Sequence, residues 1–156
     1  MLRKIPHKKI PARGGRYVIV ASRYNTRYVD AMLRAALREL KRAGGHVRIV
    51  RVPGAYEIPV VAARLSRLST LDSQLSAIVC LGVILRGATT HAQHIGEAVS
   101  NALVQIQITH GVPVIHEVLL LENEQQARER CLSRTHNRGT EAAQTALEMA
   151  RVMAAL

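Results

Sequence analysis

The chain has 156 residues, enough for one domain with its own core, and 48% of them are hydrophobic; with no Phe or Trp it offers few rings for stacking on nucleic-acid bases. No apolar run approaches the roughly 20 residues that a membrane helix needs, and no secretory signal is evident, so we expect a cytoplasmic protein without membrane contact. The net charge of +11 is uneven, because residues 1–51 hold 14 Lys or Arg and two acids whereas the remainder holds eight and nine. This basic half could bind nucleic acid, an anionic surface or a phosphorylated small molecule, or be ordinary solvated surface.

Residues 1–15 are predicted to form a flexible basic arm. Pro6, Pro11 and the Gly14–Gly15 pair interrupt any helix or strand ladder there. We therefore expect the folded domain to span residues 16–156, in which strands and helices alternate. Continuous apolar runs predict buried parallel strands, and apolar residues at helical spacing predict the helices between them.

In chain order the predicted elements are a strand at 16–22, a helix from a cap at Asn25 or Thr26 to a stop at Gly44–Gly45, a strand at 46–52, a helix at 58–68, a strand at 75–85, a helix opened by residues 86–95, a strand at 112–121, and helices at 122–130 and 140–155. This alternation predicts an α/β three-layer sandwich with a four-stranded parallel sheet in flavodoxin-like order. Ligands of such sheets bind outside the carboxyl ends of the strands. That rule points to the turns at 23–26, 53–59 and 86–91 and to the segment after Leu121.

The turn "RGATTH" (86–91) lies where the most apolar strand passes into a helix. Free N–H groups and the positive end of the helix dipole could cradle an anion there, and Gly87 would let the backbone approach it closely. Thr89 or Thr90 could equally be no more than a helix cap. The spacing of a Walker loop is missing.

His91 lies four residues before Ile95 and therefore on the side of the predicted buried stripe, at the end that opens to the cleft. A hydrogen-bonded core histidine is one interpretation, and a general acid and base beside an anion pocket is the other. His91 and His94 could share a metal ion, but no third ligand at the usual spacing is evident, so we expect no metal site.

The other segments carry weaker signals. "VPGAYEIP" (52–59) places Tyr56 and Glu57 on a turn, where Glu57 could accept hydrogen bonds from a heterocycle or lie in solvent. Arg130, near the end of a predicted short helix, could clamp a phosphate through two hydrogen bonds. Cys80 and Cys131 form no CxxC pair, which argues against a disulfide framework or a thiolate metal site.

Together, and in this order, these segments resemble the lumazine synthase family of riboflavin biosynthesis. The likeness is carried by "SRYN" (22–25), "VPGAYEIP" (52–59), "LGVILRGATTH" (81–91), "GVPVI" (111–115), "ENEQQARER" (122–130), "NRGTEAA" (137–143) and "ALEM" (146–149). The resemblance implies condensation of 5-amino-6-(ribitylamino)uracil with 3,4-dihydroxy-2-butanone 4-phosphate, releasing phosphate and water. It implies no metal and no organic cofactor.

The resemblance also implies a role for each matching residue. The expected pyrimidine-site residues are Tyr24 for stacking, Ala55, Tyr56 and Glu57 for the ribityl chain and nearby ring atoms, and Val83, Ile84 and Leu85 for the walls. The expected phosphate-site residues are Ala88, Thr89 and Arg130, with His91 as the proton-transfer histidine. His116 stands where members usually carry an apolar or aromatic residue against the ring, and Arg138 replaces a usual Lys.

The family's pockets lie between adjacent subunits of a pentamer, so the resemblance implies that His116 and Arg130 complete a neighbour's site. "LSRTH" (132–136) lacks the glycines typical of icosahedral members, so we expect a homo-pentamer or a pair of pentamers, and a shell of 60 subunits is the alternative. Riboflavin synthase is the partner protein that the family suggests. The alternative is a non-catalytic module on the same fold that binds a flavin-related ligand or, through its basic half, nucleic acid, although nucleic acid is not the expected partner.

Overall fold

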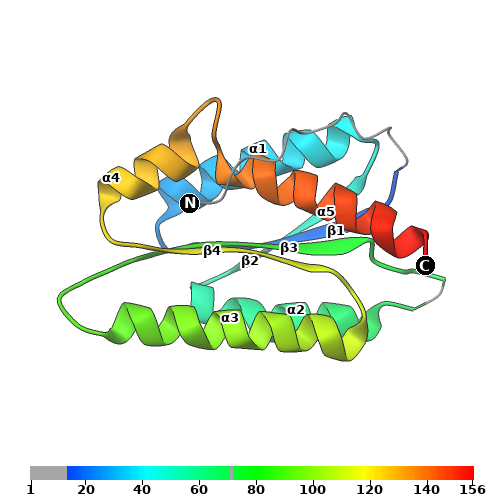
Figure 1. Cartoon of the computed structure of the whole chain (residues 1–156), viewed down its shortest axis with the longest axis horizontal. Helices are drawn as coiled ribbons and strands as arrows, with labels where there is room; N and C mark the ends of the chain where they lie inside the picture. Colours follow the sequence, from blue (N-terminus) through cyan, green and yellow to red (C-terminus); the bar gives the residue numbers. More distant parts are fainter. Residues whose placement is uncertain (1–13, 71) are drawn as a thin grey trace.

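The computed structural model of the chain describes residues 14–70 and 72–156 (Figure 1). Residues 1–13, nearly all of the predicted basic arm, lie outside the described residues. The described part contains one parallel sheet in the order β2-β1-β3-β4, with the predicted flavodoxin-like topology. Its strands are β1 (Arg16–Ser22), β2 (His46–Val52), β3 (Ala77–Leu85) and β4 (Val114–Leu121).

Helices cover both faces of the sheet, which confirms the three-layer sandwich (Figure 1). One face carries α1 (Thr26–Arg42), α4 (Glu124–Ala127), the π-helical turn η2 (Arg128–Leu132) and α5 (Arg138–Ala154). The other carries the 3-10 turn η1 (Ala55–Glu57), α2 (Ile58–Leu68) and α3 (His91–His110). None of the helices described is long and apolar enough to cross a membrane.

The sheet buries a separate aliphatic core on each face. In β1, Ile19 belongs to the core under α1 and α5, whereas Val18 and Val20 belong to the core under α2 and α3. β3 is buried along its length up to Ile84. A strand buried on both faces needs apolar residues throughout rather than in alternation, which is why its sequence is a continuous apolar run.

Some predicted element boundaries and faces are wrong. The helix predicted at 122–130 starts at Glu124, because Asn123 caps it by accepting a hydrogen bond from the Gln126 amide, and it passes into η2. The last helix starts two residues early, since the Asn137 side chain accepts a hydrogen bond from the Gly139 amide. Met153 lies at helical spacing from the buried Ala143 and Ala146 but is exposed in the last turn of α5.

The buried stripe of α3 also differs from the prediction. Its buried residues are Ala92, Val99 and Leu103, whereas Ala98 and His91 are exposed. Ile95 lies at the border of this stripe and is half-buried. Counting back four residues from it therefore leads to the exposed side of the helix, so the plain interpretation of His91 as a core histidine is wrong.

Gly139, in the first turn of α5, packs against the backbone of α1. A β-carbon at this position would lie 2.0 Å from the carbonyl oxygen of Met32. Because the overlap is with backbone atoms, no side-chain rotation can relieve it, and the two helices would have to move apart. Glycine is therefore required for the close packing of α1 and α5.

Gly139→Ala should consequently lower the free energy of unfolding by about 3 kcal/mol, the cost of overpacking a tight contact. Urea unfolding at fixed protein concentration measures it. Gly87→Ala is the matched control, because a β-carbon at Gly87 would have no heavy atom within 4 Å. Equal stability of the two variants would contradict the steric argument.

Glu117 of β4 is a buried carboxylate, 5% exposed, whose charge is compensated from α5. Arg138 Nε donates to it at 2.7 Å, and another guanidinium nitrogen of Arg138 donates to Glu141 at 2.7 Å. Burial raises the pKa of Glu117, and the charge of Arg138 opposes this effect. The planar fork of arginine serves two carboxylates at once, which explains why arginine suits this position.

Arg138→Ala should lower the free energy of unfolding at neutral pH by about 3 kcal/mol, because it leaves a charged carboxylate buried without its cation. The deficit should shrink at acidic pH: a carboxyl whose folded-state pKa is raised costs stability when ionised and costs little once protonated. Arg42→Ala is the control, since Arg42 pairs with Glu39 through a side chain that is 71% exposed; it should cost under about 1 kcal/mol. A deficit at Arg138 that is independent of pH would refute this account.

Candidate active site

Three of the predicted ligand-binding turns meet at the carboxyl end of the sheet. Asn25 donates from Nδ2 to the carbonyl oxygen of Val83 at 2.7 Å, which ties the end of β1 to the end of β3. A β-carbon on Gly54 would lie 2.9 Å from both the ring of Tyr24 and the carboxylate of Glu57. Tyr24 and Glu57 therefore both pack against Gly54, and the absence of a side chain there allows the contact.

Asn25 occupies the N-cap position of α1 as predicted, but its side chain does not cap the helix. Its backbone is left-handed, with φ 57°, a conformation that asparagine tolerates better than most residues. The amide group is used on Val83 instead, and the Thr26 hydroxyl donates to the carbonyl of Arg23. The "SRYN" segment is thus built to fix the turn that presents Tyr24.

Two tyrosine rings are exposed at this end of the sheet. Tyr24 is 69% exposed and Tyr56 is 64% exposed, although large rings are usually mostly buried. Ala55 beside Tyr56 is buried, and Glu57 accepts a hydrogen bond from the Gly54 amide at 2.9 Å. The η1 turn therefore anchors Ala55 in the core and leaves the ring of Tyr56 free for a planar ligand.

The end of β3, which is the expected apolar wall, lies at the same end of the sheet as these rings. Val83 and Ile84 are buried and Leu85 is half-buried. The next residue, Arg86, is held by an ion pair with Glu122 at the end of β4 (2.9 Å). The wall and the loop that follows it are thus fixed from both neighbouring strands.

The loop at 86–91 leaves the N-terminus of α3 open. Ala88 and Thr89 are exposed, and no acceptor within the described ranges takes a hydrogen bond from the backbone amides of residues 87–90. Thr90 takes the N-cap position without a side-chain bond, whereas the Thr89 hydroxyl accepts from the His91 amide at 3.4 Å. Free amides at the positive end of a 20-residue helix form a site for an anion.

His91 is the first residue of α3 and is exposed at the same end of the sheet. The η1 turn packs against α3, so the imidazole lies on the element that neighbours Tyr56 and Glu57. His94 is exposed as well, and the residues described contain no group of three or more His, Cys, Asp or Glu that could hold a metal. An exposed imidazole beside free amides can carry a proton to or from a ligand held there.

Arg130 and His116 are not brought to this group within one chain. Arg130 is exposed on η2, which packs against α1, α4 and α5, and α3 lies across the sheet from these helices (Figure 1). No carboxylate of the described ranges lies within 4 Å of Arg130, whereas its neighbour Arg128 pairs with Glu124. His116 is exposed on β4, the edge strand farthest from β2.

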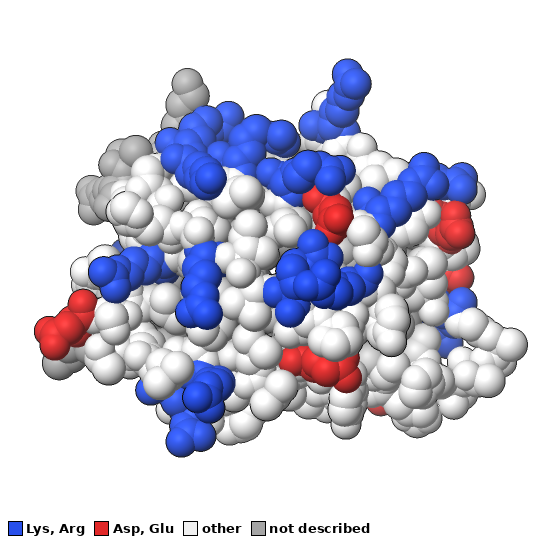
Figure 2. Space-filling model, turned by 180° about the vertical axis from the view of Figure 1, so that it is seen from behind, with Lys and Arg blue, Asp and Glu red and all other residues white. Residues whose placement is uncertain are grey.

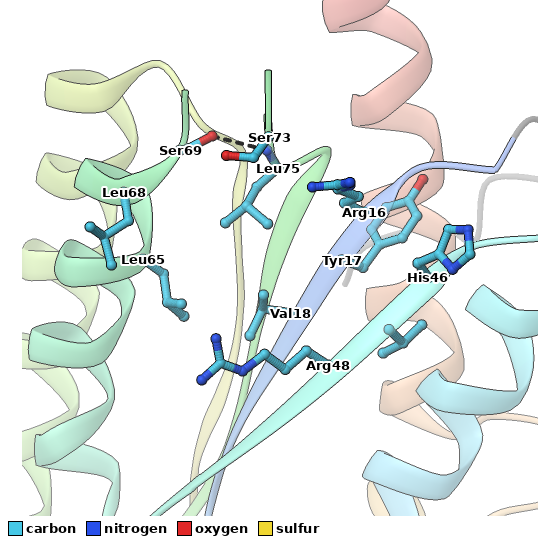
Figure 3. A pocket seen from close by; sticks show the side chains of 11 residues that line it. Arg16, Tyr17, Val18, His46, Arg48, Leu65, Leu68, Ser69, Ser73 and Leu75 are labelled. Atoms are coloured by element: carbon cyan, nitrogen blue, oxygen red, sulfur yellow. Dashed lines mark hydrogen bonds between the residues drawn. The ribbon is translucent and has the colours of Figure 1, made fainter. Parts of the chain in front are cut away.

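Two cavities of the described residues are lined by none of the predicted site residues. One, of about 570 Å³, lies at the opposite end of the sheet, between β2 and α2, and its lining includes Arg16, His46 and Leu65 (Figure 3). The other, of about 530 Å³, lies between α3 and β4. Within one chain, the exposed members of the predicted site, among them Tyr24, Tyr56 and His91, lie on an open surface.

The cysteines and the basic surface add no further chemistry to this site. Cys80 and Cys131 are free and buried, and burial raises their thiol pKa values to about 12 and about 11, so both stay protonated. Lys and Arg side chains spread over the face behind that of Figure 1 (Figure 2). On α1, the exposed Arg34, Arg38 and Arg42 follow the polar side of the helix, as predicted.

Comparison with known proteins agrees with the geometry. The family model of 6,7-dimethyl-8-ribityllumazine synthase matches residues 14–154. The chain is 38% identical over 150 residues to the 6,7-dimethyl-8-ribityllumazine synthase of Desulfotalea psychrophila, covering 94% of either chain. The match to the family model contains every strand and every predicted site residue. The chain therefore belongs to the 6,7-dimethyl-8-ribityllumazine synthase family.

Proposed function

We propose that this chain condenses 5-amino-6-(D-ribitylamino)uracil with 3,4-dihydroxy-2-butanone 4-phosphate to give 6,7-dimethyl-8-ribityllumazine, phosphate and water, in the cytoplasmic biosynthesis of riboflavin. Family membership supports the reaction. The observation that carries it in the structure is the open N-terminus of α3 beside exposed tyrosine rings at one end of the sheet. The reaction uses no metal and no organic cofactor.

The pyrimidine half of the site is formed by the turns after β1 and β2. Tyr24 stacks on the pyrimidine ring. The η1 residues Ala55, Tyr56 and Glu57 hold the ribityl chain and nearby ring atoms. One carboxylate oxygen of Glu57 accepts from the Gly54 amide, and the other oxygen is available as an acceptor for the substrate. The apolar wall of Val83, Ile84 and Leu85 excludes water from the edge of the heterocycle.

The phosphate half is formed at the start of α3. The free amides near Ala88 and Thr89 bind the phosphate, which the helix dipole favours. His91 transfers protons while the amine of one substrate forms an imine with the ketone of the other and while phosphate leaves. Holding both substrates side by side supplies much of the rate enhancement, because it replaces a bimolecular encounter.

A second copy of the chain supplies the side of the site that carries Arg130 and His116. Arg130 and His116 are exposed at positions that the strand-end group of their own chain does not use. Head-to-tail packing would place them on a neighbour's site, and such packing closes into a ring. We therefore assign Arg130 to the neighbour's phosphate and His116 to its pyrimidine, in a homo-pentamer or a pair of pentamers, with riboflavin synthase as the protein partner.

The wild-type protein, mixed with the two substrates, should form fluorescent lumazine and free phosphate faster than the same mixture without protein. Arg130→Ala should raise the KM for the phosphorylated substrate about 30-fold, the loss of a charge-assisted hydrogen-bonded pair. Arg128→Ala is the matched control, two residues away and already paired with Glu124. No acceleration by the wild type would remove the proposed activity, and an unchanged KM in Arg130→Ala would remove only the phosphate assignment.

Mixing two impaired variants tests whether the site is shared. Glu57→Ala damages one wall and Arg130→Ala the other. When both chains are unfolded and refolded together in equal amounts, about a quarter of the sites formed between neighbours should combine two intact walls, because the contact is head-to-tail. Activity should therefore exceed the mean of the two variants refolded separately. Activity equal to that mean, or a monomer by native mass measurement, would contradict a shared site.

A further inference from the structure

His116 is joined to α3 by a hydrogen bond that its place in the sequence does not reveal. Residues two apart on a strand share a face, and Val114 and Val118, on either side of His116, belong to the core under α2 and α3. The side chain of His116 therefore lies on that face of the sheet. Its Nε2 lies 2.8 Å from the hydroxyl oxygen of Ser100 on α3. α3 and β4 pack against each other here: a β-carbon on Gly96, one turn before Ser100, would be in ordinary van der Waals contact with Leu120 at 3.4 Å.

The partners of Ser100 and His116 determine where the imidazole proton lies. The Ser100 hydroxyl donates its one hydrogen to the carbonyl of Gly96 at 2.8 Å, so its oxygen can only accept from His116. Nε2 must then carry a proton. Nδ1 in turn accepts from the amide of Val118 at 3.3 Å, which requires a free lone pair on that nitrogen. Both contacts are satisfied together by the neutral ring with its proton on Nε2.

The surroundings of the ring also favour the uncharged form. Protonation of Nδ1 would make two hydrogen-bond donors, the Nδ1–H group and the Val118 N–H group, point at each other. Partial burial of the ring lowers the pKa of His116, and a hydrogen bond to its own backbone opposes this effect in part. The charged groups that line the adjacent 530 Å³ cavity between α3 and β4 are Arg86, which is paired with Glu122, and Glu97, which accepts a hydrogen bond from Gln93.

We infer that Ser100 is a positioning residue of the pyrimidine site: it fixes a proton of His116 on Nε2 and, together with the Val118 amide at Nδ1, holds the ring as a neutral imidazole, so that the exposed ring offers the substrate an uncharged, planar surface. The inference rests on the proposed function, in which His116 faces a neighbour's pyrimidine. It explains how a histidine can replace the apolar or aromatic residue that the family usually carries there. Fixing one tautomer and one orientation removes both the charge and the freedom that an unrestrained histidine would bring.

Nitrogen NMR of the assembled protein with ¹⁵N-labelled histidine tests the hydrogen bond without any substrate. At neutral pH the His116 signals, identified by their loss in His116→Phe, should show a neutral ring protonated on Nε2. Ser100→Ala should abolish this single tautomer and Ser100→Thr, which keeps the hydroxyl, should retain it. Thr145→Ala is the control, because the Thr145 hydroxyl donates to the carbonyl four residues earlier, as that of Ser100 does, without contacting a histidine.

Kinetics test the role in binding. Ser100→Ala should raise the KM for the ribitylaminouracil about fivefold, the loss of one neutral hydrogen bond, while kcat and the KM for the butanone phosphate stay unchanged. In the His116→Phe background the same substitution should have no further effect. Ser100 is exposed on a helix and alanine favours helices, so the variant should fold.

An unchanged tautomer together with an unchanged pyrimidine KM in Ser100→Ala would overturn the inference. Equal rises of the KM for both substrates would overturn it too, because they would indicate general damage. Absence of lumazine formation by the wild type would instead refute the proposed function, and the NMR result would still decide whether the hydrogen bond fixes the ring.

Discussion

The parallel alignment of the strands is the constraint on which the site depends. Because all four strands run the same way, their carboxyl ends lie at one end of the sheet, and turns that are far apart in sequence become neighbours. The bond from Asn25 to the carbonyl of Val83 secures this arrangement across 58 residues of sequence. Without it, the turn that presents Tyr24 would lose its fixed position relative to the apolar wall of β3.

The same constraint separates the residues of the proposed site from one another within one chain. β4 is an edge strand, and β3 separates it from β1 and β2. η2 follows β4 on the face of α1 and α5, whereas the anion-binding end of α3 belongs to the opposite layer. A sheet of this order therefore separates the cation at Arg130 from the amides at residues 87–90. The proposed contact between two copies of the chain brings these groups together.

Sequence reasoning predicted the elements and the strand-end turns well, because burial leaves a direct signal in apolar periodicity. It failed where a side chain has a partner distant in sequence. The bonds of Asn25 to Val83, of His116 to Ser100 and of Arg138 to Glu117 each depend on the register between β-strands or between a strand and a helix. One sequence does not reveal that register, which is why Asn25 is one of the two residues, with Thr26, expected to cap the helix.

The burial of His91 was misjudged for a different reason. The predicted side of His91 is counted from Ile95, which the structure places at the border of the apolar stripe of α3. An error of one residue rotates a helix face by about 100°, enough to move the imidazole from core to solvent. The error favours the functional interpretation, since an exposed imidazole at a helix start is free to act on a ligand.

Adjacent residues of β4 show how the chain accommodates its departures from the family pattern. Side chains of His116 and Glu117 point to opposite faces because a strand alternates. His116 turns toward α3, where Ser100 fixes its proton, and Glu117 turns toward α5, where it anchors Arg138. Each unusual residue thus has partners within its own layer. The Ser100 hydroxyl fixes the tautomer of the histidine that replaces an apolar ring, and two carboxylates fill the fork of the arginine that replaces lysine. The departures therefore need not signal a change of reaction, because each is compensated within the layer where it occurs.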